Sequence, residues 1–169
     1  LAWSRGLGDV YKRQVFMQYI KKTDSSFDEL DNKNIDFGGG LERIVAAANN
    51  EADVFKSDLM WAVIEQIQDL SGTSYKENVT AFRVITDHIR GAVFMIGDGV
   101  LPSNTEQGYF VRRLLRRAVR YADQLNIPAG ELKNLAESVI ETYHNHYINL
   151  SEQKTAIIDA ISKEEVQFR

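Results

Sequence analysis

The segment AFRVITDHIRGAVFMIGDGVLPSNTEQGYFVRRLLRRAVRY, residues 81–121, decides the fold. Its first half places apolar residues three and four positions apart, which is the spacing of one face of an α-helix. Asp98-Gly99 and Pro102 then interrupt this pattern, so the segment predicts two helices joined by a tight turn. The apolar residues of the first helix are Phe82, Ile85, Ile89, Val93 and Ile96.

The second half of the segment predicts a helix with two chemically different sides. Ser103 and Glu106 have the spacing of a capping box and predict its start. At about 100° per residue, five arginines fall within an arc of about 140°, and the opposite side is apolar. The apolar residues are Val111, Leu114, Leu115, Ala118 and Val119. The arginines, which we call the arginine surface, are Arg112, Arg113, Arg116, Arg117 and Arg120.

This cationic surface favours an anionic partner. Its guanidinium groups repel one another, and each can form bidentate hydrogen bonds with a phosphate or a base edge. The whole chain has a net charge of −4, but residues 81–121 hold seven arginines and three acids, a local +4. The remaining residues therefore carry −8. A nucleic-acid backbone is the favoured partner, and the alternative is partial pairing with carboxylates of neighbouring elements.

Composition excludes several other classes of protein. With 169 residues, 44% of them apolar, the chain can bury the core of one domain or slightly more. It has no cysteine, so it has neither a disulfide framework nor a thiolate metal site. The three histidines lack the spacing of metal ligands, and we expect no metal site. No apolar run approaches the ~18 residues of a membrane helix, and no signal peptide is visible. We therefore expect a cytoplasmic protein without membrane contact.

The two ends of the chain carry separate expectations. Residues 1–14, LAWSRGLGDVYKRQ, have no clear period, and GDVYKRQ resembles a translated sequencing adapter. We predict that residues 1–14 are non-native and leave them out of the functional argument. The last helical pattern reaches Arg169 without a stop signal, so we expect the native protein to continue beyond it.

A glycine-rich turn precedes the helices. The apolar run 15–20 and residues 35–37 predict two antiparallel strands, joined by the polar stretch 21–34 as a long loop. Gly38, Gly39 and Gly40 follow, where backbone N–H groups can approach a ligand closely. Arg43 could meet a phosphate, and Asp36 is a candidate anion for an amino group. The alternative is a purely structural turn, with Asp36 as its cap.

Three further apolar patterns predict that the remainder of the chain is helical. Ser57 and Gly72 bound the first of these helices, and Pro128 precedes the second. Their apolar residues are Leu59, Val63, Ile67 and Leu70; then Leu132, Leu135, Val139 and Tyr143; and last Ile157, Ile161 and Phe168.

Five segments, in this order and spacing, resemble the alanyl-tRNA synthetases. They are VFMQY (15–19), IDFGGGLER (35–43), FRVITDHIRGAVFMIGDGVLPSN (82–104), GYFVRRLLRRAVRY (108–121) and KEEVQF (163–168). The resemblance implies an α+β fold, in which the end of a class II antiparallel sheet domain precedes a mostly helical domain. Residues 15–56 would be the C-terminal part of the aminoacylation domain with the third class-defining motif. Residues 57–169 would be a truncated tRNA-recognition domain.

The resemblance also implies an activity and its site residues. The parent protein would be a ligase that activates alanine with ATP and Mg²⁺ and transfers it to tRNA(Ala). Arg43 would lie over ATP as a catalytic residue, beside the ATP-binding Gly38, Gly39 and Gly40. Asp36 would hold the ammonium group of alanine, and Gly38 would leave room only for a small side chain. The acceptor stem, in which this family reads a G·U pair, would be contacted by Asn104, Arg112, Arg113, Arg116, Arg117 and Arg120. The side-chain amide of Asn104 has both hydrogen-bond donors and an acceptor.

The chain also departs from the family pattern. The usual Asp-Thr-Gly-Met-Gly is Asp36-Phe37-Gly38-Gly39-Gly40 here. The first two class-defining motifs, the editing domain and its zinc ligands are absent, so we expect the isolated chain to be inactive. Two alternatives remain, namely a non-catalytic RNA-binding helical module and a helical interaction domain whose arginine surface docks an acidic partner.

Overall fold

The computed structural model describes residues 19–31 and 39–169. The chain divides into two compact units, residues 1–44 and residues 45–169, which we describe separately. The predictions for residues 1–14, for the strand at 35–37, for Asp36 and for Gly38 lie outside the described residues. The domain boundary expected between residues 56 and 57 also stays a prediction.

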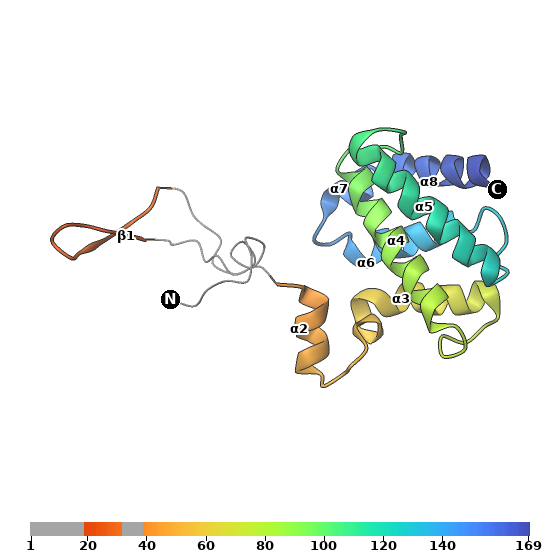
Figure 1. The fold of residues 1–169 in the computed structure, drawn as a ribbon, viewed down its shortest axis with the longest axis horizontal. Coiled ribbons are helices and arrows are strands. Elements are labelled where there is room, and N and C mark those ends of the chain that lie inside the picture. Colours follow the sequence, from red (N-terminus) through yellow and green to blue (C-terminus); the bar gives the residue numbers. More distant parts are fainter. Residues whose placement is uncertain (1–18, 32–38) are drawn as a thin grey trace, which may run out of the picture. The chain divides into compact units, whose positions relative to one another are not determined.

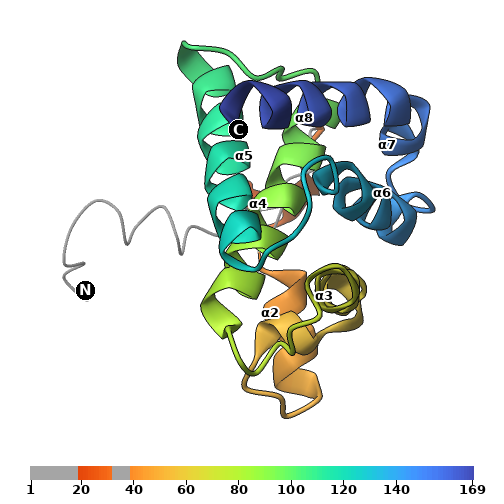
Figure 2. The same ribbon diagram turned by 90° about the vertical axis from the view of Figure 1, so that its right-hand side faces the viewer.

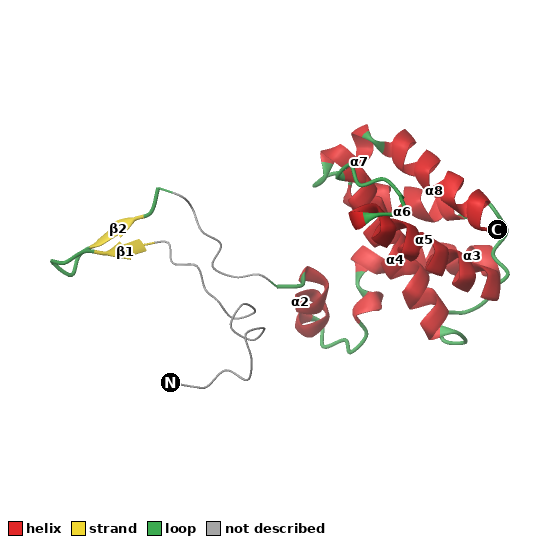
Figure 3. Ribbon diagram, turned by 45° about the horizontal axis from the view of Figure 1, so that its top comes forward, coloured by secondary structure: helices red, strands yellow, loops and turns green. Residues whose placement is uncertain are grey.

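The first unit contains a β-hairpin (Figures 1 and 3). Strand β1 (Tyr19–Lys21) pairs antiparallel with β2 (Phe27–Glu29), with Tyr19 opposite Glu29. The sequence analysis was wrong to treat the whole polar stretch 21–34 as a loop, because β2 lies within it. The cause is turn chemistry, since Asp24 Oδ1 accepts hydrogen bonds from both the backbone N–H and the hydroxyl of Ser26. This tight turn reverses the chain immediately after β1.

The second unit is helical (Figures 1 and 2). Helix α2 (Leu41–Ala48) spans the boundary between the units and is followed by the short 3₁₀ helix η1 (Val54–Lys56). The remaining helices are α3 (Asp58–Ser71), α4 (Val79–Gly97), α5 (Glu106–Gln124), α6 (Leu132–Tyr143), α7 (Ile148–Glu152) and α8 (Lys154–Phe168). The predicted α+β class, a small antiparallel sheet followed by a mostly helical part, is confirmed. Within the described ranges, no helix is both long and apolar enough to cross a lipid bilayer.

Helix α4 forms the centre of the core. Its predicted apolar face is buried to the last residue, with Phe82, Ile85, Ile89 and Val93 at 0% exposure and Ile96 at 1%. Around it pack α3, α5, α6, α7 and α8. Helix α5 contributes its own apolar side through Val111, Leu115, Ala118 and Val119, all buried. Each such aliphatic or aromatic side chain stabilises the fold by about 1.5–3 kcal/mol through burial. The prediction of two helices joined by a tight turn within residues 81–121 is therefore confirmed.

The turn between α4 and α5 differs from the predicted capping box. The N-cap residue of α5 is Thr105, without a capping side-chain hydrogen bond, so the box of Ser103 and Glu106 is wrong. Ser103 lies too far upstream to cap the helix. Its hydroxyl instead donates to the Thr105 carbonyl at 2.8 Å, and its own N–H donates to the Gly108 carbonyl at 3.1 Å. The loop is thus folded back against the first turn of α5.

A partly buried cluster of polar side chains joins the N-cap residue of η1 to α4. The Tyr75 hydroxyl donates to Asp53 Oδ2 at 2.7 Å, and Arg83 contacts the same carboxylate at 2.9 Å. Arg83 Nε also donates to the Tyr75 hydroxyl. Burial raises the pKa of Asp53, but the hydrogen bonds from Tyr75 and Arg83 outweigh it and hold this pKa below its usual value. The carboxylate form therefore stabilises the fold.

We predict that Gly108→Ala disrupts the turn that carries Asn104. A Cβ at Gly108 would lie 2.4 Å from the Leu101 carbonyl oxygen, which is backbone and cannot rotate away. The expected loss in free energy of unfolding is about 1–3 kcal/mol, measured by denaturant unfolding. Gly91→Ala in α4 is the matched control, because its Cβ would meet only Leu114 at 3.5 Å, an ordinary contact. Equal stability of the two variants would contradict this account of the turn.

We predict that Asp53→Asn lowers stability by about 1–3 kcal/mol at pH 7, because a buried charged hydrogen-bond acceptor is lost. Because the pKa of Asp53 is lowered in the folded state, this stabilisation is fully present at pH values above the pKa of an unfolded aspartate, about 3.9. It is lost as the pH falls through the lower pKa of Asp53 in the folded state. The difference between wild type and variant should therefore shrink below about pH 4. Urea unfolding at pH 7 and pH 3 measures it, with the exposed Asp69→Asn as control. An undiminished difference at pH 3 would rule out the charge as the cause.

Candidate nucleic-acid interface

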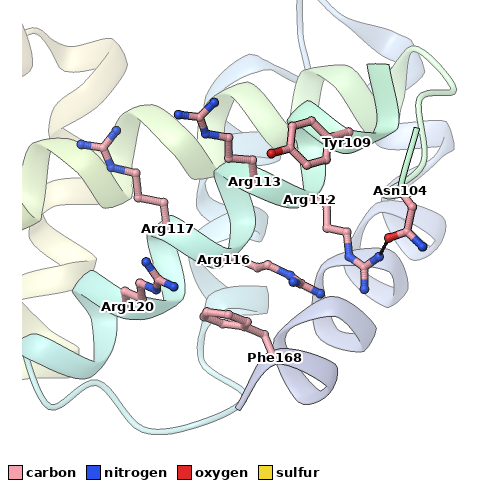
Figure 4. Close-up of a pocket in the computed structure, with 8 residues that line it drawn as sticks. All are labelled: Asn104, Tyr109, Arg112, Arg113, Arg116, Arg117, Arg120 and Phe168. Carbon is pink, nitrogen blue, oxygen red and sulfur yellow. Dashed lines mark hydrogen bonds between the residues drawn. The ribbon is translucent and has the colours of Figure 1, made fainter. Parts of the chain in front are cut away.

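The outer side of α5 lines a cavity of about 470 Å³ (Figure 4). Because the apolar side of α5 packs on α4, its arginines face outward into this cavity. All six residues that the sequence analysis grouped here are brought together by the structure, and two aromatic side chains join them. The lining residues are Asn104, Tyr109, Arg112, Arg113, Arg116, Arg117, Arg120 and Phe168.

A buried carboxylate from α8 holds two of the arginines. The side chain of Glu164 is only 5% exposed, and its Oε1 accepts hydrogen bonds from Arg112 Nε at 2.9 Å and Arg116 Nε at 2.7 Å. Partial pairing with neighbouring carboxylates, the alternative raised from the sequence, therefore applies to these two arginines. Charged hydrogen bonds of this kind are shorter and stronger than neutral ones.

The other three arginines keep their charge available. Arg113, Arg117 and Arg120 are exposed, and none forms an ion pair with any residue in the described part of the chain. Arg120 lies over the Phe168 ring at 5.6 Å from its centroid, and Arg117 lies over Tyr121 at 6.0 Å. Stacking on an aromatic ring fixes a guanidinium without neutralising it. The cavity wall therefore presents a strongly positive potential.

Asn104 is held at one end of this row. Arg112 Nη1 donates a hydrogen bond to the Asn104 Oδ1, as Figure 4 shows. This bond uses one of the two lone pairs of the amide oxygen, and both Nδ2 donors of Asn104 stay available for a ligand. The expectation that the amide offers both donors and an acceptor to RNA stays a prediction.

The sequence analysis did not assign Glu164, Tyr109 or Phe168 to this site. Glu164 and Phe168 stand four residues apart on α8, a spacing that puts both on one face of the helix. The Arg116 guanidinium carbon also lies over the Phe168 ring, at 5.2 Å from the ring centroid. The signal was present in the KEEVQF segment, which had been recognised by resemblance but given no role.

The glycine-rich turn is only partly described. Arg43 is exposed on α2, and its N–H donates to the Gly40 carbonyl at 3.1 Å. A Cβ at Gly40 would lie 3.5 Å from the Arg43 side chain, an ordinary contact. Gly39, Gly40 and Arg43 could contribute to a phosphate site, whereas Asp36 and Gly38 lie outside the described residues. Within the described ranges, no group of three or more histidine, aspartate or glutamate side chains could hold a metal ion.

The family model of tRNA synthetases class II (A) matches residues 8–169. The chain therefore belongs to the class II (A) tRNA synthetases.

Within this class, the similar proteins are alanine–tRNA ligases. The chain is 40% identical to the enzyme of Borreliella afzelii (strain PKo) over 159 residues, which is 91% of this chain and 27% of the relative. It is 41% identical to that of Shouchella clausii (strain KSM-K16) over 154 residues, covering 91% and 18%. It is 38% identical to that of Chlamydia trachomatis serovar D over 161 residues, covering 94% and 18%. The resemblance to the alanyl-tRNA synthetases is confirmed, and the chain spans between 18% and 27% of the length of these relatives.

We predict that substituting two neighbouring arginines changes the free energy of unfolding by different amounts. Arg116→Gln should lower the free energy of unfolding by about 1–3 kcal/mol, because the buried Glu164 loses a charged partner. Arg117→Gln should change it by less than about 0.5 kcal/mol, or raise it slightly, because it relieves repulsion on the exposed surface. Thermal and urea unfolding of both variants provide the test. A larger loss for Arg117→Gln than for Arg116→Gln would contradict the assigned pairing.

Proposed function

We propose that the chain is part of an alanyl-tRNA synthetase and that its arginine surface binds the acceptor stem of tRNA(Ala). The observation that carries this proposal is the shared cavity of Asn104 and the five arginines. The relatives are named as alanine–tRNA ligases, which supports tRNA as the class of polyanion.

The dimensions and chemistry of the surface suit A-form RNA. Arg112 and Arg120 are eight residues apart on one helix, or about 12 Å, so the row can follow a backbone over several nucleotides. A-form RNA presents its phosphates and a wide, shallow minor groove rather than a readable major groove. In this proposal the arginines bind phosphates and set the register, whereas Asn104 reads a base edge. The Nδ2 group of Asn104 would donate to an acceptor on the base, while its Oδ1 accepts a hydrogen bond from Arg112.

The catalytic part of the proposal concerns the parent protein. ATP would supply the adenylyl group for alanine activation, with Arg43 and the glycines Gly38, Gly39 and Gly40 at its phosphates, and with Mg²⁺ as the family cofactor. Asp36 would hold the ammonium group of alanine. Because the first two class-defining motifs are not in this sequence, the 169-residue chain would not aminoacylate. The parent protein would work in the cytoplasm.

A second candidate function is RNA binding without catalysis. The arginine-lined cavity lies wholly within the described residues of the second unit, whereas the nucleotide site does not. The isolated chain should therefore show RNA binding even though it lacks ligase activity. An acidic protein partner would bind the same surface, but with a weaker dependence on salt than a phosphate backbone shows.

We predict that Asn104 and Arg113 affect RNA binding in different ways. Asn104→Asp keeps an oxygen for Arg112 but removes the amide donors, so preference for a G·U-containing acceptor-stem minihelix over its G·C counterpart should fall by about 1–3 kcal/mol. Arg113→Ala should weaken both RNAs equally and lower the slope of log K against log salt by about one unit or less.

Fluorescence anisotropy with the two minihelices, at several salt concentrations, measures both effects. Asn104→Ala tests a purely structural role of the hydrogen bond from Arg112 to Asn104, in which stability falls by about 1 kcal/mol while RNA preference is unchanged. Retention of the full G·U preference by both Asn104 variants would contradict base reading by this residue. Salt-independent binding of the wild-type chain would contradict the phosphate contacts.

A further inference from the structure

Glu164 reaches the arginine surface from a distant part of the chain. It lies 52 residues after Arg112 and 48 residues after Arg116, and α8 packs beside α5. Its side chain is not among those that line the arginine cavity. A ligand in this cavity would thus meet the two guanidinium groups, with the carboxylate behind them.

The contact uses one particular edge of each guanidinium. Both arginines donate through Nε to the same carboxylate oxygen, Glu164 Oε1. This arrangement leaves the Nη groups for other partners, and Arg112 uses Nη1 for Asn104. In Figure 4 the Arg116 guanidinium extends over Phe168, at 5.2 Å from the ring centroid. Two arginines are thus anchored through Nε to one buried carboxylate oxygen.

We propose that Glu164 is a positioning residue for RNA binding. Its buried carboxylate holds Arg112 and Arg116 in the orientation in which their Nη groups meet the RNA backbone, and through Arg112 it also orients Asn104. This inference rests on the proposed function of the arginine surface. The partner is a phosphate backbone, because the outward Nη edges form the bidentate fork that phosphate oxygens accept.

The physical benefit is pre-organisation. A free arginine side chain has many rotamers, and binding must immobilise it at a cost equivalent to about two- to tenfold in affinity per side chain. Glu164 fixes two such side chains before the RNA arrives. Phe168, one turn further along α8, supports Arg116 and Arg120 from the same helix.

If Glu164 is a positioning residue, the change in RNA affinity on neutralising it should be opposite to the change expected from net charge alone. Removing a negative charge near an RNA site should strengthen RNA binding if charge alone matters. If Glu164 positions the arginines, neutralising it should weaken binding despite the more favourable net charge. Asp159, an exposed acid on the same helix, provides the control for charge.

The experiment measures binding of the 169-residue chain to a G·U acceptor-stem minihelix by anisotropy at fixed salt. Glu164→Gln should weaken binding roughly tenfold, whereas Asp159→Asn should leave it unchanged or slightly tighter. Glu164→Asp retains the charge but shortens the side chain by one methylene, so it should also weaken binding. It serves as the second variant if Glu164→Gln unfolds, and the melting temperature of each variant is measured in parallel.

A double-mutant cycle separates positioning from a general loss of stability. In an Arg112→Ala/Arg116→Ala background, Glu164→Gln should have no further effect on affinity, because the residues through which it acts are gone. In an Arg113→Ala background, its roughly tenfold effect should persist. A merely structural role would lower affinity by the same factor in both backgrounds.

The outcomes distinguish the two proposals. Failure of the wild-type chain to bind RNA, or indifference to Arg113→Ala, would contradict the proposed function and overturn this inference with it. Binding by wild type that is unchanged or tightened in both Glu164 variants would overturn the positioning role alone. An effect of Glu164→Gln that survives loss of both Arg112 and Arg116 would overturn it as well.

Discussion

The hydrogen bonds from Arg112 and Arg116 to the buried Glu164 reconcile two opposing demands on α5. One side of this helix must pack on α4 to complete the core, and the other side concentrates five positive charges. A buried carboxylate without partners would be strongly destabilising, and crowded arginines without an anion would add a smaller repulsion, about 0.2–0.5 kcal/mol per pair. The carboxylate of Glu164 and the guanidinium groups of Arg112 and Arg116 compensate one another's charge. The contact also joins α8 to α5, so the last described helix is tied directly to the arginine surface.

The distribution of charge is consistent with the proposal that an acidic protein binds a polyanion. The net charge is −4, and the positive excess is confined to residues 81–121. Elsewhere, a groove between α3 and α6 is lined by Glu65, Asp69, Glu137 and Glu141. Such a surface repels an RNA backbone, while the arginine surface attracts it. In the proposed function, this asymmetry would direct RNA to one place on the second unit and disfavour nonspecific binding at others.

Local pattern predicted the helices and the arginine surface, but not what supports that surface. The apolar spacing of α4 and α5 identified Phe82 to Ile96 as core because periodicity of 3.6 residues is a local property. The burial of Glu164 could not be predicted this way, since its partners are about 50 residues away in sequence. The hairpin of β1 and β2 was missed because the composition of residues 21–34 is polar, and the Asp24 turn outweighed composition. The assignments of Asp36, Gly38 and Arg43 rest on family resemblance and remain proposals.

The central claim is that acceptor-stem RNA binds the arginine surface of α5, and side-chain NMR tests it most directly. A chain labelled with ¹⁵N would be titrated with the G·U minihelix while the arginine Nε–H and asparagine Nδ2–H signals are followed. We predict saturable shifts for Asn104 and for the arginines from Arg112 to Arg120, with little change at Arg43 and Arg83. Shifts spread evenly over all arginines, or confined to residues outside α5 and its preceding turn, would contradict the claim.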